Sequence, residues 1–402
     1  MIKKKLLGRA AMGYEQRKKL YHKLEKLRNR PLIVYVTSIR PNASAQMAAD
    51  AITSIIEQVR KIPDEQKNLD FMIISNGGDP ITALRIVSIL RERFTHIAVL
   101  IPYIAYSAAT ILALGADEII MHPFSNLGPV DPQLNVQKDN GMGQTGNIAF
   151  SSEDLRNYIE FVKNDVGIKD QAFLVEALKA LGSEIGVLPI GSAKRSQQLS
   201  LALSSKMLET HINDKTQAMH IAQTLNSSYY HHGYAVGRSE AKELGLNIVK
   251  PEKELEELMW ALWEDFRGEM KCDKAFDLMS ELLGNSQIAA QITNVPVLNL
   301  PADLPQEIRG QLYNDVMQRI QIEIRTSIDI IQLMATVESS RECYQFYNKF
   351  NTIYWRNPDM SIGYNATVYN SGWEKESIGE NQSQGQALME VAATTREERQ
   401  YE

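Results

Sequence analysis

The chain has 402 residues, of which 44% are hydrophobic and 23% are charged, a composition typical of a globular protein. This composition excludes a collagen-like, low-complexity or wholly disordered chain, and the length predicts two or three domains. The formal net charge of −6 is unevenly distributed. Residues 1–30 carry eleven Lys and Arg against Glu15 and Glu25, so a basic arm precedes an acidic body.

The sequence favours a reducing compartment. Cys272 and Cys343 are too few for a disulfide framework, and we expect both to be buried free thiols. The N-terminus begins like a secretion signal, but Arg9 interrupts its apolar stretch. Residues 97–116 are uncharged over the length of a membrane span, yet Pro102 inside them favours a buried strand followed by a buried helix. We therefore expect a cytoplasmic protein.

The first third of the chain alternates between apolar runs and helical patterns. A basic helix is predicted over 14–29, and buried strands are predicted over 32–37, 71–74, 97–101 and 118–121. Helices are predicted over 44–61, with Ser44 as a possible cap, over 80–93, and from Ser107 onward. This alternation predicts an α/β fold with mostly parallel strands. Its functional loops should follow the carboxyl ends of the strands, which singles out residues 75–80 and 102–108.

The rest of the chain is predicted to be mostly helical. The polar, Gly-rich stretch 135–147 is predicted as a mobile loop, and helices are predicted over 152–164, 192–225 and 252–285. A linker over 296–305, a long helix over 306–346 and a hairpin over 352–369 follow. The predicted organisation is a basic N-terminal helix or arm (1–30), an α/β domain (31–250), a helical segment (251–288), a C-terminal α+β domain (289–369) and a disordered tail (370–402).

Two loops of the predicted sheet have unusual chemistry. Gly77 and Gly78 lie between a buried strand and a helix start, where free backbone N–H groups favour negative charge. Ser107 follows the next strand among small residues, either as an ordinary helix cap or as a nucleophile. One helix and one strand separate the two loops, so they should meet at one edge of the sheet. There they can combine a nucleophile with an oxyanion hole.

These motifs resemble the ClpP/crotonase superfamily, and more specifically the serine dehydrogenase proteinases, which are related to signal peptide peptidase A. The segments that carry the resemblance are 74–78, 106–110, 113–121, 127–133, 232–234 and 240–246. The resemblance covers about residues 31–250. It implies a ClpP/crotonase-like fold of repeated βαβ units, with a mostly helical C-terminal extension beyond it.

The resemblance implies a serine peptidase that hydrolyses peptide bonds. Ser107 corresponds to the nucleophile, and Gly77, Gly78 and Ala108 correspond to the oxyanion hole, chiefly through the N–H groups of Gly78 and Ala108. The general base stays open, because no histidine occurs at 130–131. Lys194 matches the lysine of Ser-Lys peptidases and would have to lose its charge. His232, which Asp131 would orient, has the better intrinsic pKa for a base.

Two other functions remain open. A catalytically silent scaffold or binding protein is one, because alanines follow Ser107 where relatives often have glycine. A crotonase-type acyl-CoA enzyme is the other. We expect a peptide or protein substrate and a homo-oligomer. We expect no cofactor, no metal and no nucleic acid, and the absence of a Walker motif would make any ATPase a separate protein. The basic arm is expected to contact a membrane surface or an acidic partner, or to be a solvated helix.

Overall fold

The computed structural model describes residues 13–376, except 140–144, 228, 230, 285, 287–288, 290–299, 302, 324–325 and 357–360. The helices are α1 (Tyr14–Arg28), α2 (Ala51–Arg60), α3 (Pro80–Arg93), α4 (Ala108–Leu114), α5 (Ser152–Glu160), the π-helix η1 (Phe161–Asp165), α6 (Gln171–Ile185), α7 (Val187–Leu208), α8 (Lys215–Ser227), α9 (Arg238–Glu243), α10 (Lys253–Glu269), α11 (Leu278–Gly284) and α13 (Gln306–Glu323). The strands are β1 (Leu32–Thr37), β2 (Ile39–Arg40), β3 (Ala43–Ser44), β4 (Asn68–Ile74), β5 (His96–Ile101), β6 (Ile104–Ala105), β7 (Glu118–Met121), β8 (Asn126–Leu127), β9 (Gln133–Asp139), β10 (Thr145–Ser151), β11 (Val236–Gly237), β12 (Ile248–Val249), β13 (Thr326–Glu338), β14 (Cys343–Arg356) and β15 (Ile362–Lys375).

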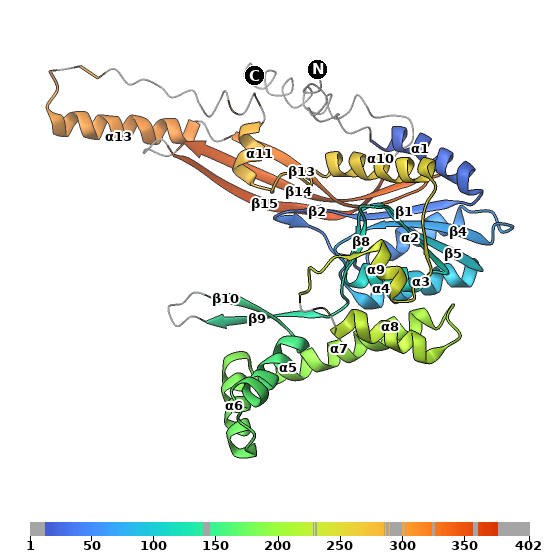
Figure 1. Ribbon diagram of the computed structural model, residues 1–402. Coiled ribbons are helices and arrows are strands. Elements are labelled where there is room, and N and C mark those ends of the chain that lie inside the picture. The colour runs from blue at the N-terminus through green and yellow to red at the C-terminus, as the bar shows by residue number, and fades with distance from the viewer. Residues whose placement is uncertain are drawn as a thin grey trace, which may run out of the picture.

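An eight-stranded sheet forms the centre of the molecule, in the order β12-β7-β5-β4-β1-β13-β14-β15 (Figure 1). Strands β12 to β1 are parallel, whereas β13 joins β1 in antiparallel register and begins an antiparallel extension. The parallel strands are continuous apolar runs, such as β1, in which every residue is buried. Such runs are expected where helices cover both faces of a sheet. A small sheet of β11, β8 and β6 stands beyond the carboxyl ends of β4 and β5.

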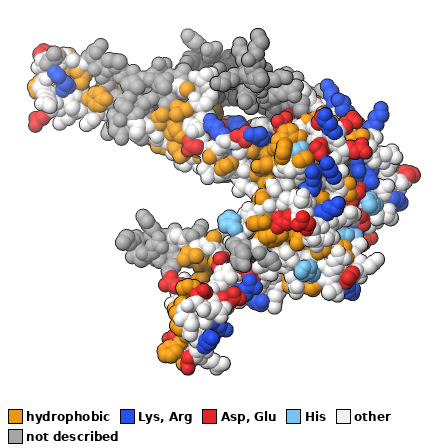
Figure 2. All heavy atoms as spheres, viewed as in Figure 1, with side chains coloured by type: hydrophobic (Ala, Val, Ile, Leu, Met, Phe, Trp, Pro, Cys, Tyr) orange, Lys and Arg blue, Asp and Glu red, His pale blue; other side chains and the backbone are white. Residues whose placement is uncertain are grey.

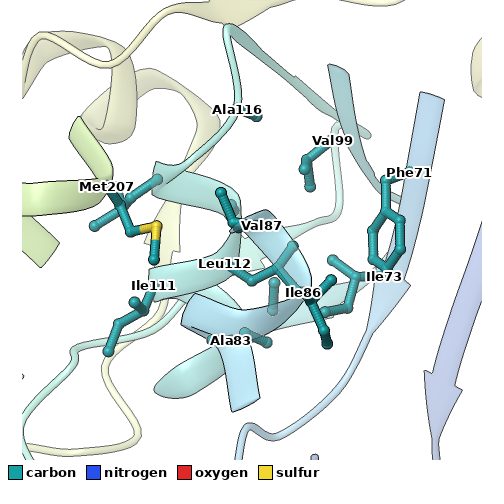
Figure 3. Close-up of a cluster of buried hydrophobic side chains, with 14 of the residues drawn as sticks. Phe71, Ile73, Ala83, Ile86, Val87, Val99, Ile111, Leu112, Ala116 and Met207 are labelled. Atoms are coloured by element: carbon teal, nitrogen blue, oxygen red, sulfur yellow. The ribbon is translucent and has the colours of Figure 1, made fainter. Parts of the chain in front are cut away.

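Two apolar cores lie on opposite faces of the parallel strands. One core packs the sheet against α2, α3, α4, α7 and α8, and the other packs it against α1 and α10. Figure 3 shows part of the first core, where Phe71 and Val99 of the sheet face Ile86 of α3 and Leu112 of α4. Helix α4 consists of small and apolar residues and is buried along its whole length. It therefore fixes the loop before it against the sheet.

The parallel strands with helices on both faces confirm the predicted α/β class. The uncharged stretch 97–116 forms β5, β6 and α4 rather than one long helix. Among the described residues, no helix combines the length and the apolar character needed to cross a membrane. The predicted helix at 44–61 begins later than expected, because Ser44 lies in β3 and Asp50 occupies the N-cap of α2. Both cysteines are free thiols, Cys343 being buried and Cys272 partly buried.

Two predicted elements beyond residue 130 have the wrong type of secondary structure. Residues 133–139 and 145–151 form a β-hairpin instead of a mobile loop, because Leu134 and Val136 alternate with polar residues and pair with Phe150 and Ile148. The helix predicted over 306–346 ends at Glu323, since the apolar residues of 326–338 belong to β13. The predicted hairpin at 352–369 is present as part of β14 and β15, which continues to Lys375. Residues 377–402 of the predicted tail lie outside the described residues.

Two arms project from one side of the body and give it a hollowed outline (Figures 1 and 2). One arm holds β13–β15 and α13, and the other holds the β9–β10 hairpin, α5 and α6. The second arm exposes large apolar side chains on α6 and at the start of α7. They are Phe173, Val175, Leu178, Val187 and Leu188, and they are between 47% and 85% exposed.

The N-terminal helix belongs to the body rather than being a free arm. Arg17 of α1 is fully buried, and its guanidinium contacts Asp265 (2.6 Å), Glu269 (2.6 Å) and Glu338 (2.8 Å). The hydroxyl of Tyr21 also donates to Glu338, at 2.7 Å. The acidic partner of this helix is therefore its own chain, through α10 and β13. The basic residues 1–12 lie outside the described residues.

We predict that Arg17→Met destabilises the fold by about 3–5 kcal/mol, because it removes the counter-charge of the fully buried Glu338 carboxylate. Denaturant unfolding followed by circular dichroism measures this loss. Lys19→Met, at an exposed position of the same helix, is the control and should change the stability by less than about 0.5 kcal/mol. Equal stabilities of the two variants would contradict the structural role of Arg17.

We also predict a pH dependence of stability from Glu269. Burial raises the pKa of Glu269 to about 7, although Arg17 acts in the opposite direction. The folded state therefore binds this proton more tightly than the unfolded state does. The resulting stability is fully present below about pH 4.5 and is lost as the pH rises through 7. Glu269→Gln should remove up to about 3 kcal/mol of the decline in stability between pH 5 and pH 8. Denaturation at a series of pH values tests this, with the exposed Glu254→Gln as the control that keeps the wild-type profile.

Candidate active site

The two loops singled out by the sequence lie together at the carboxyl ends of β4 and β5. Ser75 pairs with Ala105 as an isolated parallel bridge. The Ser75 N–H donates to the Ile104 carbonyl (3.2 Å), and the Tyr106 N–H donates to the Ser75 carbonyl (3.0 Å). These bonds hold the strand end that leads to Gly77 beside the strand end that leads to Ser107. The predicted meeting of the two loops is thus seen in the geometry.

Ser107 has an unusual backbone conformation, with φ 52° and ψ −119°. A positive φ is uncommon for a residue with a Cβ and costs about 1–3 kcal/mol at this kind of position. Such conformations persist only where the surroundings impose them, and a serine on a sharp strand-to-helix turn presents its hydroxyl outward. Ser107 precedes α4 directly, and its side chain accepts no capping bond. The N-cap interpretation of Ser107 is therefore not supported by a capping hydrogen bond.

Gly77 and Gly78 permit the close approach that this turn requires. A Cβ on Gly77, at φ 101°, would lie 2.5 Å from the Tyr106 carbonyl oxygen and 2.8 Å from Ser107 Cβ. A Cβ on Gly78, at φ 147°, would contact the backbone of Met47 at less than 3 Å. A side chain on Gly77 would push the two loops apart, and a side chain on Gly78 would displace the backbone of Met47. The glycines are thus required both by their φ angles and by the available space.

Two backbone donors beside Ser107 are free to bind a ligand. Among the described residues, the N–H groups of Gly78 and Ala108 donate to no protein group. A Cβ on Gly77 would lie 3.0 Å from the Ala108 nitrogen, so this donor faces the glycine loop. Gly77 was predicted as a third donor, but its own N–H donates to Ser75 Oγ (3.0 Å). Its contribution is therefore conformational.

His232 and Asp131, both predicted as site residues, lie in direct contact although they are 101 residues apart in the sequence. His232 Nδ1 is 2.6 Å from Asp131 Oδ1, and Gln133 Nε2 donates to the other carboxylate oxygen at 3.3 Å. Asp131 is 7% exposed, whereas about a third of the His232 side chain is exposed. A proton on Nδ1, held by Asp131, leaves Nε2 as the acceptor nitrogen. Gln133, which the sequence did not single out as a site residue, helps to orient the carboxylate.

The chain links this pair to the Ser107 turn. A Cβ on Gly128 would lie 2.7–3.0 Å from the side chain of Tyr106, the residue before Ser107. Thr110 Oγ1 on α4 donates to the Gly128 carbonyl at 2.9 Å. Asp131 follows Gly128 by three residues, a span of at most about 11 Å. Within the described residues, no hydrogen bond joins the Ser107 hydroxyl to His232, Asp131 or Lys194.

Lys194 lies in a different setting. Its Nζ is exposed and donates to Gln197 Oε1 at 3.2 Å. Lys194 lines an open groove beside α5 and α8 together with Arg156. This exposed position lacks the apolar enclosure that a lysine base would require. Of the two predicted bases, only His232 has a carboxylate that orients it.

His122 packs locally in an aromatic cluster. Its ring stacks on Trp260, with 4.9 Å between the ring centroids, and its Nδ1 accepts from the Phe124 N–H. Burial lowers the pKa of His122. This histidine belongs to an aromatic cluster rather than to the loops around Ser107.

We predict that Gly77→Ala destabilises the fold by more than about 2 kcal/mol, because the new Cβ meets the Tyr106 carbonyl and the backbone is held at positive φ. Thermal and denaturant unfolding measure the change. The matched control is Gly191→Ala in α7, where nothing lies within 4 Å of the added Cβ and alanine favours the helix. Similar stabilities for the two variants would show that the loops can separate without cost.

The sequence was compared with known protein families and with curated proteins. Residues 44–141 match the family model described as ClpP-like SDH-type serine proteinase. Two curated relatives from Methanocaldococcus jannaschii, the uncharacterized proteins MJ0137 and MJ1495, are each 26% identical over 194 and 197 residues. Each alignment covers 48% of this chain, and the chain spans little more than half of the relatives, 57% and 56% of their lengths.

The solved structures that resemble this chain include two proteases. A mutant of the 1510-N membrane-bound stomatin-specific protease is 14% identical, with a TM-score of 0.34 and coverage of 56% of this chain and 83% of that chain. ClpP1 from Listeria monocytogenes is 11% identical, with a TM-score of 0.30 and coverage of 57% and 98%. The family match itself contains Gly77, Gly78, Ser107 and Asp131. The family model thereby confirms the resemblance to the serine dehydrogenase proteinases over residues 44–141, the segment that it matches.

Proposed function

We propose that the protein is a serine peptidase in which Ser107 forms an acyl-enzyme. The observation that carries this proposal is the Ser107 turn, where a strained serine lies at the start of a buried helix beside two free backbone donors. A structural serine gains nothing from such a conformation, whereas a nucleophile gains exposure and an adjacent anion site. The ClpP-like serine proteinase match over residues 44–141 supports a peptidase.

The first half of the reaction follows from these groups. Ser107 Oγ attacks the peptide carbonyl carbon while its proton passes to His232 Nε2. The carbonyl oxygen becomes an oxyanion and accepts from the N–H groups of Gly78 and Ala108. The tetrahedral intermediate then expels the amine, which takes the proton from His232. A water molecule hydrolyses the acyl-enzyme by the same steps, with His232 as base and then as acid.

Asp131 has a positioning role in this proposal. Its carboxylate holds the Nδ1 proton of His232, which fixes the tautomer and stabilises the imidazolium that forms during each step. Gln133 holds the carboxylate in turn. Closing the remaining distance between His232 and Ser107 accompanies substrate binding, since catalytic hydrogen bonds are often long in the free enzyme.

We predict that a fluorophosphonate probe labels Ser107 and that His232→Ala slows this labelling by a factor of about 10³–10⁴, because the serine loses its base. Ser107→Ala should abolish the labelling, and Asp131→Asn should slow it. Mass spectrometry of the labelled protein identifies the modified residue and measures the rate.

The matched control for this experiment is His22→Ala, an exposed histidine on α1, which should be labelled at the wild-type rate. Circular dichroism establishes that each variant is folded. An unlabelled but folded wild-type protein would contradict the proposal. Equal labelling rates for His232→Ala and wild type would exclude His232 as the base.

A catalytically silent scaffold is the second candidate function, and one observation favours it. Within the described residues, the Ser107 hydroxyl has no hydrogen bond to a base. A silent scaffold would keep the α/β fold and bind peptides without modifying Ser107. The labelling experiment separates the two functions, because only a peptidase activates the hydroxyl.

The proposed peptidase function also indicates what the protein binds. The substrate is a peptide or protein, and the protein assembles into a homo-oligomer in the cytoplasm. The apolar side chains that α6 and α7 expose, such as Phe173 and Leu188, support a protein–protein contact on this arm. The basic residues ahead of α1 are proposed to make peripheral contact with an anionic membrane or an acidic partner.

A further inference from the structure

An open groove of about 430 Å³ lies between α5, α7 and α8, next to the proposed active site. Ten residues line it: Arg156, Lys194, Gln197, Gln198, Leu201, His220, Gln223, Thr224, Asn226 and Ser227. None of these residues is an aspartate or a glutamate, although the chain carries a net charge of −6. The lining instead consists of cationic, amide and hydroxyl groups around Leu201, which suits an anionic ligand.

Lys194 contributes a positive charge to the groove. Its ammonium donates to the neutral Gln197 and, among the described residues, forms no ion pair. Arg156 forms ion pairs with Glu153 (2.6 Å) and Glu160 (3.6 Å), which hold its guanidinium at the rim and leave further N–H donors. Gln197 in turn donates to Glu153 at 2.6 Å. The cations are thus held in place by the residues around them.

Asn226 adds an unused donor to the same wall. This residue is 3% exposed, and its side-chain nitrogen has no hydrogen-bond partner among the described residues. A buried donor without a partner is costly and is seldom retained without a reason. The neighbouring hydroxyls of Thr224 and Ser227 donate to helix carbonyls, so they accept rather than donate toward the groove. The donors that remain are the amide, ammonium and guanidinium groups, which are the groups that bind a carboxylate.

The groove adjoins the pocket that contains the His232–Asp131 pair. This second pocket has a volume of about 220 Å³ and shares Arg156 and Ser227 with the groove. Its own lining is acidic through Asp131, Glu153 and Asp154. Burial raises the pKa of Glu153, an effect that nearby Asp131 increases and Lys194 opposes. A ligand that crosses from one pocket to the other therefore passes from a basic wall to an acidic one.

We infer that the groove binds a carboxylate of the peptide substrate, so that the enzyme prefers peptides with an acidic group a few residues from the scissile bond. This inference rests on the proposed peptidase function and assigns its substrate class. Lys194 and Arg156 bind the carboxylate, and the peptide then reaches His232 through the shared boundary of the two pockets. Lys194 thus serves recognition rather than proton transfer. The carboxylate is either a Glu or Asp side chain or the C-terminus of the peptide.

Matched quenched-fluorescence peptides test this assignment. In one series a single Glu is moved along an otherwise neutral sequence and is compared with Gln at each position, and in another the C-terminus is either free or amidated. We expect kcat/KM for the best Glu peptide, or for the free C-terminus, to exceed its neutral counterpart by about tenfold, which corresponds to one charge-assisted hydrogen bond. Lys194→Gln should remove most of this preference by lowering kcat/KM for the acidic peptide toward the value for its neutral counterpart. The series that shows the preference identifies the source of the carboxylate.

The control is Lys206→Gln, an exposed lysine on the same helix outside the groove, which should keep the preference. Equal cleavage of acidic and neutral peptides by the wild type would overturn the inference while the peptidase function stands. An undiminished preference in Lys194→Gln would overturn it as well.

A binding measurement separates this inference from the peptidase function. Fluorescence anisotropy with the Ser107→Ala protein reports peptide binding without cleavage. The Glu peptide should bind about tenfold more tightly than the Gln peptide, and Lys194→Gln should abolish the difference. Competition by inorganic phosphate alone would identify a general anion site and overturn the peptide assignment. If binding shows the preference but no peptide is cleaved and Ser107 is not labelled, the groove assignment stands and the peptidase function fails.

Discussion

The contact between the Gly77 loop and the Ser107 turn is the constraint on which the proposed chemistry depends. Ser107 is held at a positive φ because the strand end before it is hydrogen-bonded to Ser75 and the helix after it is wholly buried. Gly77 lies so close to this turn that no side chain fits. The packing of α4 in the core compensates for the unfavourable backbone conformation of Ser107, as expected where a site is built on rigid elements.

Charged groups gather on both faces of the central sheet. The sequence of α1 suggests a separate basic arm, but Arg17 fixes this helix to the body. Its guanidinium binds Asp265, Glu269 and Glu338 in the apolar layer on one face of the sheet. On the other face, the groove gathers Lys194 and Arg156 beside the acidic pocket of His232. One set of charges stabilises the fold by being buried and paired, and the other stays accessible for a ligand.

Local patterns were sufficient to predict the βαβ order and the meeting of residues 75–80 with 102–108, because both follow from strands and helices that adjoin in sequence. The sequence was not sufficient where partners are remote. The apolar residues of 326–338 are compatible with a helix or with a strand. Their pairing with β1 makes this segment the strand β13. The proposal of His232 rather than Lys194 as the base likewise rests on the contact of His232 with Asp131, which is 101 residues away in the sequence. The groove around Lys194 comes from three helices whose packing no local pattern specifies.

A crystal structure of the protein after reaction with a peptidyl phosphonate tests the central claim most directly, because the phosphonyl group mimics the tetrahedral intermediate. The account predicts a bond from phosphorus to Ser107 Oγ and a phosphonyl oxygen within hydrogen-bonding distance of the Gly78 and Ala108 nitrogens, with His232 Nε2 facing Oγ. A phosphonyl group attached to another residue, or an oxygen directed away from both N–H groups, would contradict it.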